Sequence, residues 1–173
     1  YIKKDVLNII YESDVVVSMM IDFYRLPSDT PGFSESTEVQ THKEQADLLE
    51  ARIKEDLENS QNQRFDNFIP YIQLHEFEAL VFASINGITD LFERNEMNYD
   101  GLIDVIRQYP NPEDINNLPD TAPSVRLKKL IYGYNKVVDG INIITTAGMS
   151  VLLEKCPRFK DWVERMETAL REE

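Results

Sequence analysis

The sequence predicts an α/β protein with a parallel sheet flanked by helices and a mostly helical C-terminal half. Residues 14–22 carry apolar side chains on both alternating faces of a run that ends in Asp22, as strands covered on both sides do. Residues 65–74 read as a second strand, and an amphipathic helical pattern lies between the two. This order is typical of a β-α-β unit, whose crossover is almost always right-handed.

The elements follow in order along the chain. Residues 3–13 predict a helix by apolar spacing, and residues 23–40, rich in Pro, Gly and Ser, predict a long loop. "THKE" at residues 41–44 has the spacing of a capping box and starts the next helix. Pro70 inside the second strand predicts an edge position or a bulge, because proline cannot donate a ladder hydrogen bond.

The remainder is predicted to be mainly helical. Residues 99–109 form one short helical pattern, and residues 111–124 form a loop that ends at a helix start. We expect Thr121 as a possible helix cap there, with Pro123 in the first turn. Residues 156–170 place an apolar stripe on one face, which is most simply a packing helix.

Composition indicates an ordinary globular chain. The 173 residues are 42% hydrophobic and 28% charged, and we expect one domain over residues 1–173. No apolar run approaches the roughly 18 residues that span a bilayer, so no membrane role is expected. The single Cys156 favours a reducing compartment, the cytoplasm. Because the chain opens without methionine, we expect N-terminal residues to be missing.

The formal net charge of −13 opposes nucleic acid on average and favours cations or basic partners. Residues 124–136 are a local exception, since they carry four basic residues, Arg126 and Lys136 among them, and no acidic one. Such a segment is commonly a solvated helix face. The alternative is a phosphate-binding patch, through which an acidic body could still contact nucleic acid.

Several enzyme classes lack their motifs in this sequence. There is no phosphate-binding loop and no dinucleotide fingerprint. "HEFEA" has Ala79 where a zinc protease has its second histidine, and "GMSVL" lacks the second glycine of a nucleophile elbow. Nucleotide-dependent kinases, zinc proteases and serine hydrolases are therefore not expected.

Carboxylates stand where the second strand runs into the next apolar segment, "FIPYIQLHEFEALVF". When residues 74–82 are read as an α-helix, Glu78 faces the apolar side, Glu76 faces water or a cleft, and His75 lies between them. A carboxylate on an apolar face must be paired or metal-bound. Glu78 could therefore pair with a lysine or arginine, or it could hold a metal ion.

Asp22 strengthens the metal alternative. Ligands of parallel α/β sheets bind beyond the carboxyl ends of the strands, where Asp22 closes one strand and His75 and Glu76 close the other. If the strands are neighbours, these groups converge at one edge. Carboxylate oxygens suit Mg²⁺ or Mn²⁺, and phosphoryl transfer is a standard use of such a site.

Four blocks of the chain also resemble a family of bacterial and archaeal proteins of unknown function. They are "MMIDFYRLPSDTPG", "RFDNFIPYIQLHEFEALVF", "PEDINNLPDTAPSVRL" and "KCPRFKDWVERME", and they come in the family's order over nearly the whole chain. That family is thought to be TOPRIM-like, akin to the metal-binding domain of topoisomerases, primases and OLD-type nucleases. The resemblance implies a parallel α/β core and a place in phage defence or DNA handling beside an ATPase.

The sequence departs from the TOPRIM pattern in two ways. The glutamate expected after a first strand is absent, so we expect the first βα unit to lie outside this chain. Asp22 is followed by Phe23 and Tyr24, so one aspartate stands where the pattern has a pair. Asp22 carries over to the expected metal site, and Glu76 and Glu78 are our own candidates for completing it.

Two functions are therefore expected from different classes. The first is Mg²⁺- or Mn²⁺-dependent phosphodiester cleavage, with metal on Asp22, Glu76 and Glu78. In this reading His75 and Glu76 would act in catalysis, His75 by orienting a carboxylate or water, and Arg126 and Lys136 would contact phosphate. The second is a non-catalytic interaction or regulatory subunit that keeps the fold and binds an ATPase or another effector. The charge and the lone aspartate favour the second function, and the carboxylates favour the first.

Overall fold

The computed structural model describes residues 2–24, 26–115 and 118–171. The chain divides into two compact units, and each is described by itself. The first unit comprises residues 1–73 and 161–173, and the second comprises residues 74–160. Within the described residues, no helix is both long enough and apolar enough to cross a membrane.

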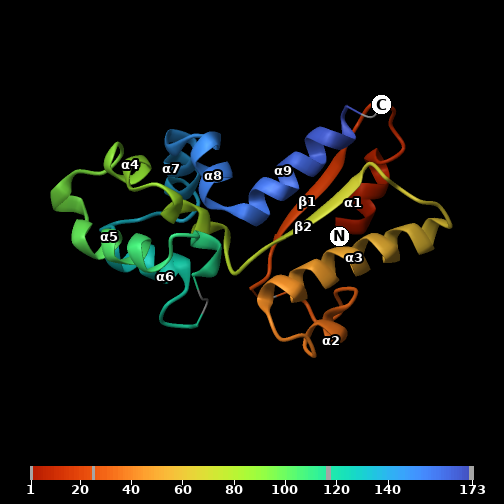
Figure 1. Ribbon diagram of the computed structural model, residues 1–173, viewed down its shortest axis with the longest axis horizontal. Coiled ribbons are helices and arrows are strands. Elements are labelled where there is room, and N and C mark those ends of the chain that lie inside the picture. Colours follow the sequence, from red (N-terminus) through yellow and green to blue (C-terminus); the bar gives the residue numbers. More distant parts are fainter. Residues whose placement is uncertain (1, 25, 116–117, 172–173) are drawn as a thin grey trace. The chain divides into compact units, whose positions relative to one another are not determined.

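The first unit contains a parallel two-stranded sheet. Strand β1 (Val17–Asp22) pairs with β2 (Phe68–Gln73), and Asp22 and Gln73 are register partners at the carboxyl end. Helix α3 (His42–Gln61) joins the strands, which confirms the β-α-β unit (Figure 1). The class is therefore mixed α/β with a small parallel sheet and many helices, as the sequence predicts in outline.

Helices cover both faces of the sheet. Helix α1 (Ile2–Ile9) and α3 lie on one face, where Val6 and Leu57 share an apolar cluster with Val17 and Phe68. Helix α9 (Pro157–Ala169) lies on the other face, since Trp162 stacks on Tyr71 with ring centroids 4.7 Å apart. Figure 1 shows the two strands between α9 and α3.

Helix α3 begins where the sequence predicts. Thr41 is its N-cap, and its hydroxyl oxygen accepts from the Glu44 N–H at 3.2 Å. The Glu44 carboxylate accepts from the Thr41 hydroxyl at 2.7 Å, rather than from the Thr41 backbone as a full capping box requires. Before α3, the predicted loop holds the short helix α2 (Phe33–Ser36), which contacts α3.

The second unit is built from short helices around an apolar core. Its elements are 3-10 helix η1 (Phe77–Ala83), α4 (Ile85–Thr89), η2 (Arg94–Glu96), α5 (Tyr99–Gln108), η3 (Pro112–Asp114), α6 (Pro123–Leu130), α7 (Asp139–Ala147) and α8 (Met149–Lys155). Phe82, Leu102, Leu127 and Ile143 are buried members of one core cluster. The helical C-terminal half is thus confirmed.

Local details of the second unit differ from the sequence prediction. Helix α6 has Ala122 as its N-cap with Pro123 behind it, so Thr121 is not the cap. Asn116 and Asn117 of the predicted 111–124 loop lie outside the described residues. Cys156 follows α8 and is fully buried, and burial together with the nearby Glu113 carboxylate raises the pKa of its thiol to about 12.

Candidate functional site

The candidate site is built on the segment that follows β2. His75 adopts a left-handed backbone conformation (φ 66°), and Glu76 returns to extended geometry before η1 begins. Residues 77–83 form a 3-10 helix, in which successive side chains turn by about 120° rather than 100°. The α-helical reading of residues 74–82 therefore does not give the true side-chain directions.

Glu76 is buried, not directed to water, and it binds the start of α6. Its carboxylate accepts from the Ser124 N–H at 2.9 Å and from the Ser124 hydroxyl at 3.0 Å. The alanine at the N-cap of α6 has no side-chain oxygen for this purpose. A carboxylate distant in the sequence thus accepts from an N–H of the first helical turn, which has no acceptor within the helix, and complements the positive end of the helix.

Glu78 is buried, as its apolar position predicts, with 1% of its side chain exposed. Its partner is Lys136, whose Nζ lies 3.0 Å from Glu78 Oε2 and 3.8 Å from Glu76 Oε1. The Lys136 side chain is 46% exposed. The pairing alternative for Glu78 is therefore present, with Lys136 as the cation.

The Glu78 carboxylate lies in a poorly solvated place. Burial raises its pKa, and the ion pair with Lys136 opposes that shift without cancelling it. Neither Glu78 oxygen has hydrogen-bond geometry toward another described group, and the same holds for the buried Tyr134 hydroxyl. Burial, and then the negative charge of Glu78, raises the pKa of Tyr134. Buried polar atoms of this kind commonly mark a place for water or an ion.

The two predicted phosphate-binding residues already make internal contacts. Arg126 donates through Nε to the Thr121 carbonyl at 2.7 Å, and its guanidinium lies 5.4 Å from the Tyr109 ring centroid. Lys136 pairs with the carboxylates described above. Lys136 is exposed, as are Lys128 and Lys129 of α6, and the two lysines of α6 agree with a solvated helix face.

Asp22 belongs to the first unit, whereas His75, Glu76 and Glu78 belong to the second. The parallel register confirms that β1 and β2 end at the same edge of their sheet. A metal site shared by Asp22 with Glu76 and Glu78 stays a prediction. Among the described residues, no three carboxylate, imidazole or thiol groups gather in the way a metal ion needs.

Two further buried glutamates have no counterpart in the sequence analysis. Glu113, 1% exposed, accepts from the backbone N–H groups of Arg158 at 2.9 Å and Phe159 at 3.0 Å, in the first turn of α9. Glu50 accepts from the Ile72 N–H on β2 at 2.8 Å. Their partners are 22 to 46 residues away in the sequence, so no local sequence pattern predicts these hydrogen bonds.

The chemistry available at the Glu76, Glu78 and Lys136 cluster is the holding of a cation and the movement of a proton. Two carboxylates already surround one ammonium group, and Glu78 has oxygens left without hydrogen bonds. Mg²⁺ and Mn²⁺ prefer carboxylate oxygens, and the described residues supply two carboxylates here. Either ion would still need further ligands or water.

The fold and this cluster define a mixed α/β protein with a small parallel sheet and a helical unit that buries acidic side chains. The chain belongs to the family described as a domain of unknown function, DUF4276, which matches residues 1–167. Comparison with curated proteins gave no match, and comparison with solved structures gave none either.

Proposed function

We propose that the chain is a non-catalytic interaction subunit that binds a partner protein through its second unit. The observation that carries this proposal is a concentration of exposed apolar side chains. Ten large apolar residues are exposed among the described residues, and five of them lie within 18 residues of the sequence. These five are Tyr132, Val137, Val138, Ile141 and Met149.

Three of these five residues, Val137, Val138 and Ile141, are named here the Val137 patch. They are 77%, 50% and 57% exposed, at the start of α7. Scattered apolar residues on a surface need no explanation, but neighbouring ones commonly mark an interaction site. Residues 138 and 141 are three apart, the spacing of neighbours on one helix face.

Three of the candidate site residues support the same proposal because they already bind other parts of the fold. Glu76 holds the start of α6, and Glu78 is neutralised by Lys136. Arg126 is held by Thr121. Each group therefore has a structural reason to be present without any chemistry.

The partner that we propose is an ATPase, as the family resemblance implies, acting in phage defence or DNA handling with a TOPRIM-like subunit. A purified candidate ATPase, encoded beside this protein, would be titrated against the chain by surface plasmon resonance. Val137→Lys combined with Ile141→Lys should weaken binding by at least about tenfold, because charged groups would face an apolar contact.

Leu91→Lys is the matched control, since Leu91 is an exposed apolar residue of the same unit outside the patch. It should leave the affinity unchanged. Equal binding by wild type and the double variant would show that the Val137 patch is not the contact. No binding by wild type to any neighbouring gene product would remove the ATPase proposal itself.

A second candidate, Mg²⁺-dependent phosphodiester cleavage, is favoured by one observation: two buried carboxylates, Glu76 and Glu78, lie beside the same Lys136 ammonium group. A divalent ion could displace Lys136 from Glu76 and Glu78 and release it toward phosphate. Mn²⁺ titration by calorimetry tests the ion alone, and Glu78→Gln should weaken binding by at least about tenfold. Plasmid nicking and RNA degradation, with Mg²⁺, Mn²⁺ or a chelator, test the activity. If the chain neither binds Mn²⁺ nor cleaves nucleic acid, this candidate is wrong.

A further inference from the structure

The Val137 patch departs from the usual rule that apolar side chains turn inward and charged ones turn outward. Val137 is 77% exposed, the highest value among the large apolar residues that the structure describes. Its neighbour Lys136 instead reaches Glu78, whose side chain is only 1% exposed. The apolar and the charged neighbour have thus exchanged their usual places. Departures of this kind are expected at functional sites.

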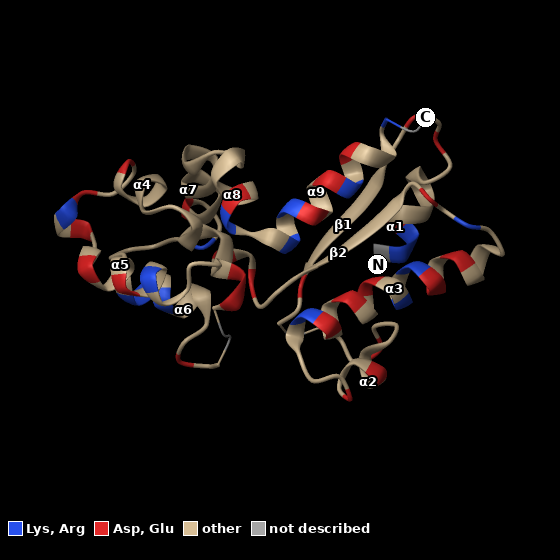
Figure 2. Cartoon of the chain, viewed as in Figure 1, with Lys and Arg blue, Asp and Glu red and all other residues tan. Residues whose placement is uncertain are grey.

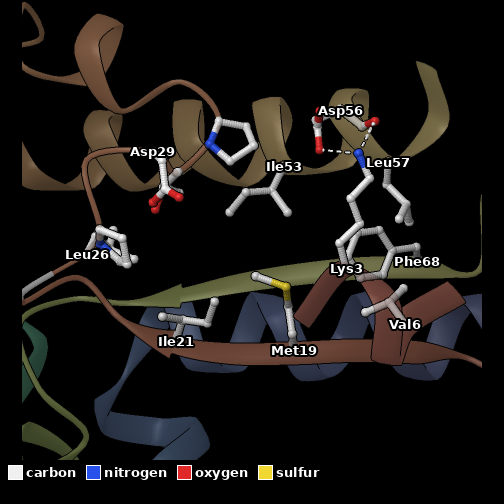
Figure 3. Close-up of a pocket in the computed structure, with 13 residues that line it drawn as sticks. Lys3, Val6, Met19, Ile21, Leu26, Asp29, Ile53, Asp56, Leu57 and Phe68 are labelled. Carbon is white, nitrogen blue, oxygen red and sulfur yellow. Dashed lines mark hydrogen bonds and ion pairs between the residues drawn. The ribbon is translucent and has the colours of Figure 1, made fainter. Parts of the chain in front are cut away.

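The first unit shows the ordinary arrangement. In Figure 3, Val6 and Phe68 line an apolar cavity, and Lys3 reaches Asp56 at one side of it. That ion pair is 2.6 Å long, and its two side chains are 23% and 43% exposed. There the cation meets a partly solvated carboxylate while the valine stays buried.

Lys136 also differs from most basic residues in its place in the fold. Figure 2 shows Lys and Arg residues gathered on helices such as α3, α6 and α9. Lys136 belongs instead to the connection between α6 and α7. Connecting segments are less firmly fixed than helices, so a side-chain ion pair can decide which conformation such a segment adopts.

The turn that carries Lys136 leads directly into α7. The Val138 and Asp139 N–H groups donate to the Asn135 carbonyl at 3.2 and 2.8 Å. The Val137 N–H donates to the Asn135 side-chain oxygen at 3.0 Å, and the Asn135 N–H donates to the Asp139 carboxylate at 2.6 Å. The last two bonds are exposed to water, so each contributes modestly to stability. The turn can therefore re-form when a contact that anchors it is lost.

Helical spacing assigns the residues of this turn and of α7 to two faces. Positions 136, 140 and 143 share one face. On it Ile143 is fully buried, and Gly140 lies against η1, since an added Cβ would meet the Phe77 ring at 3.7 Å. The Val137 patch lies on the opposite face. The inward face therefore begins with the cation of Lys136, and the buried carboxylate of Glu78 receives it.

We infer that Glu78 is a positioning residue that keeps the Val137 patch exposed. Its carboxylate draws the Lys136 ammonium group toward η1 at 3.0 Å, and the turn thereby presents Val137 to solvent. Without that carboxylate, hydration favours Lys136 outside, and the hydrophobic effect favours Val137 in the place left beside η1. The docking surface then closes. The inference rests on the proposed function only in assigning the patch to partner binding.

The test measures the exposure of position 137 directly. Val137→Cys introduces a second thiol into the full chain, in which Cys156 is the single natural cysteine. N-ethylmaleimide, an uncharged reagent, labels an exposed thiol quickly and the buried Cys156 slowly. Mass spectrometry of the two peptides gives both rates. The rate at Cys156 reports unfolding, and the rate at position 137 reports the patch.

Glu78→Gln in this background should slow labelling at position 137 at least about fivefold and leave the rate at Cys156 unchanged. General loosening of the fold has the opposite sign, because it speeds both reactions. Glu154→Gln is the matched control, since it neutralises an exposed acid of the same unit and should change neither rate. Lys136→Arg keeps a cation at the anchor and should keep the rapid labelling.

If Glu78→Gln unfolds the chain, both rates rise together, and Lys136→Glu then tests the same step. Its carboxylate is repelled by Glu76 and Glu78, so residue 136 leaves η1. Labelling at position 137 should slow to a similar extent.

Two results would overturn the inference. The first is labelling at position 137 that is unchanged or faster in Glu78→Gln while Cys156 stays protected. It would mean that the hydrogen bonds of the turn hold the patch outward by themselves. The second is unchanged labelling in Lys136→Glu, should that variant be needed.

A different result would address the proposed function. Glu78→Gln, without the added cysteine, is also titrated against the candidate ATPase by surface plasmon resonance, and binding should weaken at least about fivefold. If labelling slows as expected but this affinity is unchanged, Glu78 does position the patch. The patch is then not the contact with that partner, and the proposed function fails instead.

Discussion

The two units bury acidic side chains to different extents. Among the described residues, the first unit, with 19 acidic and 9 basic residues and a formal charge of −10, buries only Glu50. The second carries 12 acidic and 9 basic residues, a charge of −3, and buries Glu76, Glu78 and Glu113. Long helices and paired strands satisfy most of their own backbone groups, whereas short helices leave many N–H groups open.

This contrast indicates that buried carboxylates in the second unit mainly accept hydrogen bonds from backbone N–H groups that have no acceptor within their own helix. Glu76 and Glu113 each satisfy the start of a helix, α6 and α9. Only Glu78 accepts no such bond, and it relies on Lys136. The predictions below test whether stability in the second unit depends on these acids, from the largest expected effect to the smallest.

The largest effect is expected from Glu113→Ala. It leaves the Arg158 and Phe159 N–H groups at the start of α9 without their acceptor, and we expect a loss of about 4 kcal/mol in the free energy of unfolding. Urea denaturation measures it. Glu154→Ala, at an exposed acid of α8, is the control and should change stability by less than about 0.5 kcal/mol. A comparable loss in both variants would contradict the special role of Glu113.

Lys136→Ala should cost about 2 kcal/mol at pH 7, because it leaves the buried Glu78 carboxylate without its cation. The loss is smaller than for a fully buried pair, since Lys136 is half-exposed. It should shrink as the pH falls through the pKa of Glu78, which burial raises, because the protonated carboxyl needs no cation. Lys128→Ala, on exposed α6 surface, serves as the control, and a pH-independent loss in Lys136→Ala would exclude this mechanism.

In the first unit, Trp162→Phe should cost about 1 kcal/mol. The change removes the hydrogen bond from Trp162 Nε1 to the Ser18 hydroxyl at 2.8 Å and keeps an aromatic ring against Tyr71. A double-mutant cycle with Ser18→Ala isolates this bond. Zero coupling between the two changes would show that the hydrogen bond does not hold α9 to the sheet.

The smallest effect is expected from Glu78→Gln, less than about 1 kcal/mol at pH 7, because the freed Lys136 can be hydrated. The pKa of Glu78 is raised in the folded state by burial, so its contribution to stability is full below the unfolded pKa and is lost as pH rises through the folded pKa. The always-neutral glutamine should therefore gain stability relative to wild type as the pH rises from the ordinary range of a glutamate pKa through the raised pKa of Glu78. Thermal melts across that range measure it, and a flat difference would contradict the raised pKa.

The sequence predicts the β-α-β unit well because its signals are local. Two apolar runs, a capping threonine and an amphipathic helix each act over a few residues, and Pro70 marks its edge within its own strand. It also predicts that Glu78 is buried and paired. The strand and helix signals depend on local periodicity, which tertiary contacts do not overturn here, whereas Glu78 is buried although η1 is not the α-helix assumed for that prediction.

Other features could not be read from the sequence because distant residues decide them. A helical wheel at 100° per residue places Glu76 on the outward face. Because η1 is a 3-10 helix, and because Ser124, 48 residues away, donates to its carboxylate, Glu76 is buried instead. Ala122 replaces Thr121 as the cap of α6 for the same reason, since Glu76 supplies the acceptor. The structural role of Glu113 is not predicted from the sequence, because its hydrogen-bond partners are 45 and 46 residues away.

Labelling of Cys156 can report on local opening of the second unit. With a pKa of about 12, roughly one thiol in 100,000 is ionised at pH 7, and the sulfur is fully buried. A maleimide or disulfide reagent can therefore react only when α8 and its surroundings open. Because the chain has one cysteine, the rate of labelling in native buffer measures how often the surroundings of Cys156 in this unit open.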